Sequence, residues 1–447
     1  MPGIRIQFTA SAFSALLLFL TAEVWAQSSV ADKYGAKVSQ LVNGMYPKLE
    51  DVYKDIHAHP ELGFQETRTA AKLAAEMSAM RFQVTEKVGK TGVVAIFRNG
   101  PGPTVLVRTE LDALPVEEKT GLPYASTVKS TSFGRETFVA HSCGHDIHMA
   151  SWLGTARTLL ALKDQWQGTL MFVAQPAEEL LGGGGAKAML ADGLFKRFGK
   201  PNFAFALHTY PAPFGTVAYN VGPMTSNSDG LEITFKGRGG HGPAPDKTVD
   251  PITIAAHFIV DVQTVVSREK NPMEFGVVTV GAMQAGTAGN IIPDSAVLRG
   301  TIRSYKPEVR AKLLDGVRRT AKAAAMMAGA PEPEVTLEEG PLAVVNSEQV
   351  VAATETVLQA ALGADNVKRI PPMTNSDDFS AFVNEGVPSM FFFIGVYPPE
   401  RVAESMKPGG KPLPFNHSPL FAPVPEPSIK TGVQAMSLAV LNVLTKH

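Results

Sequence analysis

A short polar segment of the chain carries thiol, imidazole and carboxylate groups side by side. Residues 141–146 read HSCGHD and contain Cys143, the only cysteine of the sequence. Such a segment is poor material for an apolar core, because each buried polar group needs a hydrogen-bond partner. Thiolate, imidazole and carboxylate together suit a borderline-soft divalent ion. The segment therefore indicates a metal site.

A pair of adjacent carboxylates follows in the segment QPAEE at 175–179. Neighbouring residues of an extended chain point to opposite sides. One of Glu178 and Glu179 could therefore bind a metal ion while the other faces the water that the ion activates. The alternative is two solvated acids at the end of a strand, which is the usual role of an isolated Glu-Glu pair.

The elements around these segments predict an α/β domain. Strands are expected at 92–97, 104–109, 169–175 and 203–208, and helices at 51–59, 68–80 and 147–162. This alternation favours a mostly parallel sheet with helices on both faces. Ligands of such sheets gather beyond the carboxyl ends of the strands. The acids Glu110, Asp112, Glu178 and Glu179 and the imidazole of His208 are all expected there.

From Gly222 onward the pattern changes to that of a second unit. Strands at 231–236, 275–283, 296–304 and 334–338 are expected with helices at 251–267 and 307–328. This βαββαβ order is ferredoxin-like, with helices on one face of a four-stranded sheet. A helix at 347–362 and a buried strand at 389–394 then resume the first pattern. We expect a catalytic domain in two parts, 27–223 and 343–447, around an inserted lid or dimerisation domain at 224–342.

The net charge of the chain and the pattern of residues 1–26 indicate its binding partners and its cellular location. The 447 residues include 41 Lys plus Arg and 42 Asp plus Glu, a formal net charge of -1. Nucleic-acid binding is carried by clustered positive charge, so no nucleic-acid partner is expected. Residues 1–26 have the pattern of a cleaved signal peptide, with Arg5 before an apolar stretch and a small residue at Ala26. We expect a periplasmic or secreted protein that leaves the membrane after cleavage; the alternative is an uncleaved anchor.

Several motifs occur in order between about Tyr46 and the C-terminus. They are RTELDALP at 108–115, HSCGHD at 141–146, QPAEE at 175–179, GGHG at 239–242, GTAGNIIPD at 286–294 and NHSP at 416–419. Together they resemble the metal-dependent amidohydrolase and metallopeptidase family of hippurate hydrolases, N-acyl-amino-acid hydrolases and auxin-conjugate hydrolases. Carboxypeptidase G and succinyl-diaminopimelate desuccinylase are more distant relatives.

The resemblance implies a site for two divalent ions and a general base, and thiolate plus imidazole tolerates Zn, Mn, Co or Ni. The implied base is Glu178. The implied ligands are Cys143, His145, Glu179, His208 and His417.

The resemblance also implies a homodimer through the inserted domain. His241 of the partner subunit would stabilise the transition state; the alternative is a turn histidine in a glycine-rich loop. Asn290 and Arg303 match positions that contact substrate in relatives, and a guanidinium suits a substrate carboxylate.

Two positions depart from the family pattern. Relatives commonly have Asp where Glu110 stands and Glu where Asp377 stands. Each change keeps the charge and moves a carboxylate by one methylene, which puts substrate preference or the geometry around the ligands in doubt. Asp112 and Asp378 are therefore given supporting roles only.

The remaining histidines near the motifs have less specific roles. His141 and His148 flank the metal motif and either support ligands or serve packing or the start of the helix. His57 and His59 lie at a helix end and are expected to be structural.

These motifs predict an exported hydrolase that cleaves the amide bond of N-acyl amino acids or related conjugates. The nearest alternative is a dipeptidase or carboxypeptidase-type exopeptidase, which uses the same machinery. An alternative from another class is a non-catalytic protein that binds metal or small ligands. Glu178 argues against it, because a binding role has no need for a free base beside the ligand set.

Overall fold

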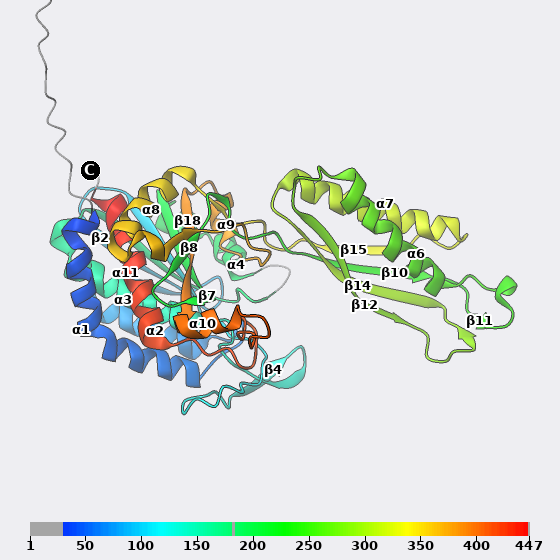
Figure 1. The fold of residues 1–447 in the computed structure, drawn as a ribbon, viewed down its shortest axis with the longest axis horizontal. Coiled ribbons are helices and arrows are strands. Elements are labelled where there is room, and N and C mark those ends of the chain that lie inside the picture. The colour runs from blue at the N-terminus through cyan, green and yellow to red at the C-terminus, as the bar shows by residue number, and fades with distance from the viewer. Residues whose placement is uncertain (1–29, 181–183, 446–447) are drawn as a thin grey trace, which may run out of the picture.

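The computed structural model describes residues 30–180 and 184–445. The expected signal peptide at 1–26 lies outside the described residues. Within the described ranges, no helix combines the length and the apolar character needed to cross a bilayer. Figure 1 shows a larger unit built around one sheet and a smaller unit beside it.

The larger unit is built on an 8-stranded sheet. Its central strands run parallel, and antiparallel neighbours flank them. The sheet therefore confirms the predicted α/β class with a mostly parallel sheet. In spatial order the strands are β1 (Gln83–Val88), β2 (Gly92–Asn99), β6 (Gly168–Gln175), β3 (Thr104–Glu110), β7 (Phe203–Pro213), β18 (Ser389–Tyr397), β8 (Val217–Tyr219) and β17 (Val367–Arg369).

Helices cover both faces of this sheet, because its central strands are apolar on both sides. In β18, Phe392 belongs to the core under one layer of helices, whereas Phe391 and Phe393 belong to the core under the other. The first layer contains α1 (Val30–Ala58), α2 (Thr67–Ala79), α3 (His145–Ala161), α8 (Glu348–Leu362) and α11 (Pro425–Leu444). The second contains α4 (Gly185–Ala191), α5 (Leu194–Phe198) and α9 (Ser380–Asn384).

Two helices differ from the expected bounds. The helix expected at 51–59 is only the last part of the 29-residue α1. Gly35, Gly44 and Pro47 are weak helix formers and conceal its earlier turns in the sequence, although residues such as Val38 and Val42 recur on its buried face. The helix expected from 147 begins at His145, which places that imidazole in the first turn of α3.

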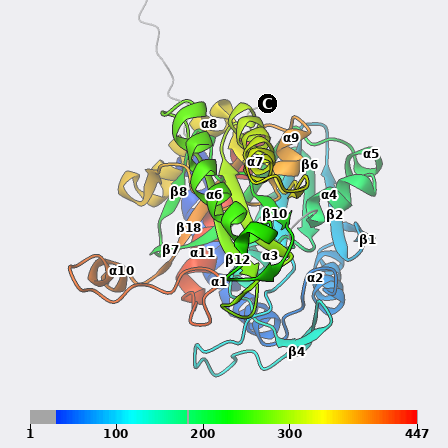
Figure 2. The same ribbon diagram turned by 90° about the vertical axis from the view of Figure 1, so that its right-hand side faces the viewer.

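The smaller unit has a 4-stranded antiparallel sheet with its own apolar core. Figures 1 and 2 show both of its long helices on one face of this sheet. The strands in spatial order are β12 (Gly276–Ala285), β14 (Ser295–Ser304), β10 (Asp229–Lys236) and β15 (Glu334–Glu338), and the helices are α6 (Pro251–Thr264), continued by a π-helical turn at Val265–Glu269, and α7 (Pro307–Met327).

Short elements complete the described chain. A ribbon of β11 (Gly240–His241) and β13 (Ile291–Ile292) lies at the end of the smaller unit farthest from the larger one (Figure 1). The others are the hairpin β4 (Lys129–Ser132) and β5 (Arg135–Phe138), the pair β9 (Gly222–Pro223) and β16 (Val345–Asn346), the helix α10 (Pro399–Ser405), and 3-10 turns at Lys163–Gln165, Pro245–Lys247 and Ala364–Asn366.

Candidate metal centre

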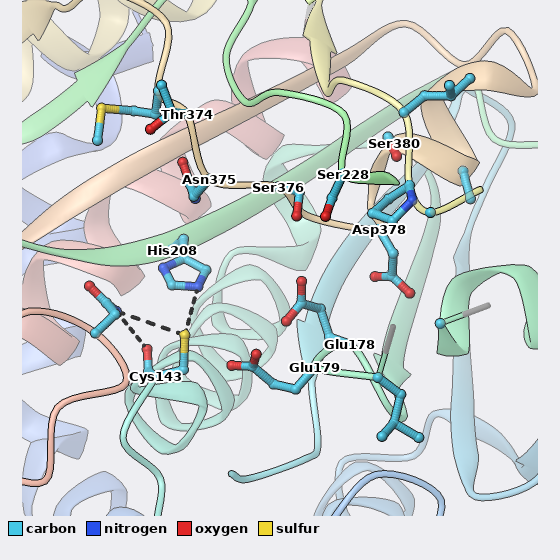
Figure 3. A pocket seen from close by; sticks show the side chains of 18 of the residues that line it. Cys143, Glu178, Glu179, His208, Ser228, Thr374, Asn375, Ser376, Asp378 and Ser380 are labelled. Atoms are coloured by element: carbon cyan, nitrogen blue, oxygen red, sulfur yellow. Dashed lines mark hydrogen bonds between the residues drawn. The ribbon is translucent and has the colours of Figure 1, made fainter. Parts of the chain in front are cut away.

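Side chains from separate elements converge at the carboxyl edge of the central strands. Cys143 precedes α3, and His208 lies on β7 where that strand pairs with β18. The Cys143 Sγ atom is 3.4 Å from His208 Nε2. Figure 3 shows the Cys143 thiol and the Glu178 and Glu179 side chains turned toward the same space near His208.

Potential donor atoms cluster here in overlapping groups. Within each group, one nitrogen, sulfur or carboxylate oxygen per residue lies within 4.8 Å of the others. Four of the groups contain sequence-predicted ligands: Cys143 with His145 and His208, Cys143 with Glu179 and His417, His145 with Glu178 and Glu179, and His145 with Glu110 and His148. The structure thus brings together all the residues that the sequence assigned as ligands, and the assigned base with them.

Backbone carbonyls fix the orientation of two of the imidazoles. His145 Nδ1 donates to the Asp112 carbonyl at 2.8 Å, and His208 Nδ1 donates to the Thr209 carbonyl at 2.8 Å. In each ring this leaves Nε2 facing the cluster, which is how metal-binding histidines are commonly oriented.

The C-terminal histidine reaches the cluster on a loop that is tied to the Cys143 segment. The His417 backbone N–H donates to the Ser142 carbonyl at 2.7 Å, and the Asn416 amide donates to the Cys143 carbonyl at 3.0 Å. His417 adopts a left-handed backbone with φ 71°, and its Nε2 lies 3.2 Å from Glu179 Oε1. The NHSP motif therefore contributes both the histidine and the amide that anchors it.

The chemistry of this cluster fits a divalent cation. The His145 Nε2 atom is buried and has no hydrogen-bond partner among the described residues. Burial lowers the pKa of His145, but its contact with Asp112 and the nearby Glu110 carboxylate raise it overall to about 10. The surrounding carboxylates thus favour positive charge at this point. Sulfur, imidazole and carboxylate donors together match the preference of zinc and similar ions.

Glu178 and Glu179 lie near the same imidazole but differ in the direction of their pKa shifts. The two are not on opposite sides of an extended strand, as the sequence suggested, because both lie in a turn after β6. Their carboxylates lie 3.9 and 4.0 Å from the same atom, His145 Nε2. Burial, together with the Asp377 and Glu179 carboxylates, raises the pKa of Glu178 well above its usual value. A carboxylate with a raised pKa accepts a proton readily at neutral pH.

A buried arginine forms hydrogen bonds with the acids next to the donor cluster. Arg108 lies on β3, and each of its side-chain nitrogens donates a hydrogen bond to a buried partner. Its Nη2 donates to Asp377 Oδ1 at 2.9 Å and to Asp378 Oδ1 at 3.0 Å, and its Nη1 donates to Glu110 and to Asp377. Both departures from the family pattern, at 110 and 377, therefore meet on one guanidinium.

A cavity of about 860 Å³ opens above the cluster and reaches both units. From the larger unit it is lined by Cys143, Glu178 and His417, and from the smaller unit by Arg303. Arg303 donates to Ser376 Oγ at 3.1 Å. The structure thus places Arg303 on the wall of the same cavity as the candidate metal ligands.

His241 and Asn290 do not line this cavity within one chain. Both are exposed, on the β11 and β13 ribbon and the loop before β13, where the Gly242 N–H donates to the Asn290 carbonyl at 2.8 Å. Figure 1 shows this ribbon far from the larger unit. Any contact with a metal cluster would require a second subunit or a movement of the smaller unit.

The structure shows the contacts of two buried histidines whose partners the sequence did not identify. His148 Nδ1 donates to Glu110 Oε2 at 2.9 Å, and its Nε2 accepts from the Thr209 N–H at 2.8 Å. His57, expected to be structural, bonds Asp146 at 2.6 Å through Nδ1. No local sequence pattern predicts the contact between His57 and Asp146, because 89 positions separate them.

Comparison with known proteins agrees with this arrangement. The profile of peptidase family M20/M25/M40 matches residues 106–407. The N-acetylcysteine deacetylase of Bacillus subtilis is 33% identical over 353 residues, covering 78% of this chain and 88% of that protein. The hippurate hydrolase of Campylobacter jejuni is 36% identical over 340 residues, covering 75% and 85%.

A solved structure matches the fold over both units. The YXEP protein of Bacillus subtilis, described as a dinuclear metal binding peptidase from the M20 family, is 29% identical with a TM-score of 0.72. The match covers 90% of this chain and 99% of that one.

Proposed function

The chain belongs to peptidase family M20/M25/M40 and is a metal-dependent amidohydrolase, and we propose that its substrates are N-acyl amino acids or related amino-acid conjugates. The observation that carries the proposal is Glu178. It is a partly buried carboxylate of raised pKa beside a cluster of sulfur, imidazole and carboxylate donors. Relatives named for hippurate and N-acetylcysteine support the N-acyl amino acid class.

We propose that Cys143, His145, Glu179, His208 and His417 hold two divalent ions. Ions at such a site lower the pKa of water and polarise an amide carbonyl. Zinc, manganese, cobalt and nickel all tolerate this mixture of donors.

Glu178 acts as the general base in this proposal. It takes a proton from the water that attacks the amide carbon, and it returns the proton to the departing amine nitrogen. Its raised pKa suits both steps, since a carboxyl that holds a proton near neutral pH can also give one up. Arg303 on the cavity wall has the charge and the planar donors to bind the substrate carboxylate.

We further propose a homodimer in which His241 and Asn290 act in the partner's site. The edge strand β12 of the smaller sheet supports this, because Val277 and Met283 on it are 36% and 44% exposed. An open edge is a ready site for pairing with another chain. Solution scattering tests the dimer, and a fully active monomer would contradict the role given to His241.

Export is proposed from the pattern of residues 1–26. Amino-terminal sequencing of protein recovered from outside the cytoplasm should begin at residue 27. Recovery of the intact chain from the membrane fraction would favour the anchor.

The experiment that tests the activity is a substrate panel combined with one isosteric variant. N-acetyl and N-benzoyl amino acids, dipeptides and C-terminally extended peptides are compared in the same assay, since a relative named carboxypeptidase is 34% identical. Glu178→Gln should lower turnover at least several hundredfold and retain metal. Glu179→Gln is the matched control, because it should lower the metal content. Unchanged turnover in Glu178→Gln would refute the proposed base.

A further inference from the structure

The residue before the general base has an unusual backbone. Ala177 links β6 to Glu178 and has φ 49°, in the left-handed region. A residue with a Cβ atom in this region costs about 1–2 kcal/mol. Such a conformation persists where its surroundings over-determine it. The contacts of Ala177 therefore decide where the Glu178 side chain points.

One of those contacts is a fully buried carboxylate from a distant part of the chain. Glu66 is 0% exposed, and its Oε1 accepts from the Ala177 N–H at 2.7 Å. Its other oxygen accepts from the Thr91 hydroxyl. Both carboxylate oxygens of Glu66 are thus engaged, and one of them holds the strained peptide directly.

Glu66 does not serve the helix that it precedes. It stands at the N-cap of α2, where a carboxylate usually accepts from N–H groups of its own helix, yet its side chain makes no such bond. Glu61 does this instead, accepting from Arg68 N at 3.0 Å and Thr69 N at 2.7 Å. Capping of α2 therefore does not explain why a carboxylate is buried at 66.

Three further contacts hold the turn around Ala177 and Glu178. The Ala177 carbonyl accepts from the Gly185 N–H at 3.0 Å. A Cβ atom at Gly63 would lie 3.1 Å from Ala177 Cα, so the chain before Glu66 packs directly against the turn. The Glu179 N–H donates to Asp112 Oδ2 at 2.9 Å. Two carboxylates thus accept the N–H groups on either side of Glu178.

We propose that Glu66 is a positioning residue that fixes the left-handed turn at Ala177 and so aims the Glu178 carboxylate. This inference rests on the proposed function, in which Glu178 is the general base. Glu66 belongs neither to the donor cluster nor to the cavity lining described above, and its hydrogen bond to Ala177 links it to Glu178. A different carboxylate, Asp112, accepts from the Glu179 N–H, so loss of the Glu66 contact should displace Glu178 more than the metal ligand.

Three variants separate positioning from a general structural role. Glu66→Met keeps most of the side-chain volume and removes the acceptor. Glu66→Gln restores it, since its amide oxygen can accept from Ala177 and its NH₂ can donate to the Thr91 hydroxyl. Thr91→Val is the matched control, because it removes the contact with the other oxygen of Glu66 and leaves the Ala177 bond in place.

The expected result is a loss of kcat in one variant only. Glu66→Met should lower kcat by about 10- to 100-fold, because small misplacements of a catalytic group are costly. Its KM and metal content should stay within about twofold of the original enzyme. Glu66→Gln should recover kcat, and Thr91→Val should keep it even if its melting temperature falls. If Glu66→Met does not fold, Glu66→Asp, which is too short to reach both partners, takes its place.

Other outcomes overturn the inference. They are a normal kcat in Glu66→Met, a Glu66→Gln variant as impaired as Glu66→Met, or an equal loss in Thr91→Val. A crystal structure of Glu66→Met provides a readout that does not depend on activity: Ala177 should leave the left-handed region, and an unchanged φ refutes the inference. If the unaltered enzyme hydrolysed no substrate, the proposed function would fail, and this structure would still decide the role of Glu66.

Discussion

Exchanging the acids at 110 and 377 should reveal that they are energetically coupled through Arg108. In this chain Glu110 and Asp377 both accept from the Arg108 guanidinium, at the two positions where the family resemblance leads us to expect Asp and Glu. The longer acid at one position faces the shorter acid at the other. We therefore expect the two departures to compensate for each other. The single variants Glu110→Asp and Asp377→Glu should together lose more stability than the double variant does.

The contacts give the size of the effect. Glu110 bridges Arg108 and His148 Nδ1, so the shorter Asp gives up one charge-assisted bond, worth about 1.5–3 kcal/mol. Glu at 377 adds a methylene to a filled buried site, which costs about 1–3 kcal/mol. The double variant should be about 1–2 kcal/mol more stable than the sum of the single variants, as for other contacting pairs. It should not recover fully, because Asp377 Oδ1 also accepts from the Phe379 N–H at 2.8 Å.

Urea unfolding followed by tryptophan fluorescence measures these free energies. Trp152 and Trp166 lie in the larger unit, and Trp25 belongs to the expected signal peptide, so the signal of the processed chain reports the unit that contains Arg108. Additive free energies in the three variants would refute the coupling. Lys236→Ala, at a surface pair with Glu334 in the smaller unit, should leave this transition unchanged and serves as the control.

Three further predictions follow from the site and its surroundings. Chelation should abolish turnover and lower the melting temperature by about 5–10 °C, because the ions bind only the folded chain; turnover that survives complete metal removal would exclude the metal-dependent mechanism. Gly144→Ala should destabilise by more than about 2 kcal/mol and reduce the metal content, since Gly144 has φ 85° and its added Cβ would lie 2.5 Å from Thr209 Oγ1; an unperturbed melting temperature would contradict the close contact. Burial lowers the pKa of His57, but Asp146 and Glu118 raise it overall to about 10. His57→Gln should therefore lower the free energy of unfolding by about 3 kcal/mol below about pH 6.5, and by progressively less as pH rises toward 10. A loss that does not change with pH would show that His57 is not charged.

The candidate ligands came from the resemblance of short motifs to the amidohydrolase family, and the structure brings these residues together. The alternation of strands and helices in the sequence predicts His208 and Glu179 at one edge of the sheet. The orientation of Glu178 was not predictable, because it depends on a bond between Glu66 and Ala177 that spans 111 positions. A side chain that bonds a distant backbone N–H leaves no periodicity in the sequence. The same applies to Glu110 and Asp377, whose meeting on Arg108 needs three separate segments of chain.

The position of β18 within the larger sheet has a consequence for biosynthesis. This strand lies between β7 and β8, yet it is made after the entire smaller unit, and α11 packs against α1 only once the last residues have been synthesised. Until then β7 presents an unpaired edge to other nascent chains, which favours aggregation. Premature termination of translation should therefore yield insoluble chains that lack the His417 loop. Metal binding by the full set of candidate ligands must follow synthesis of the complete polypeptide.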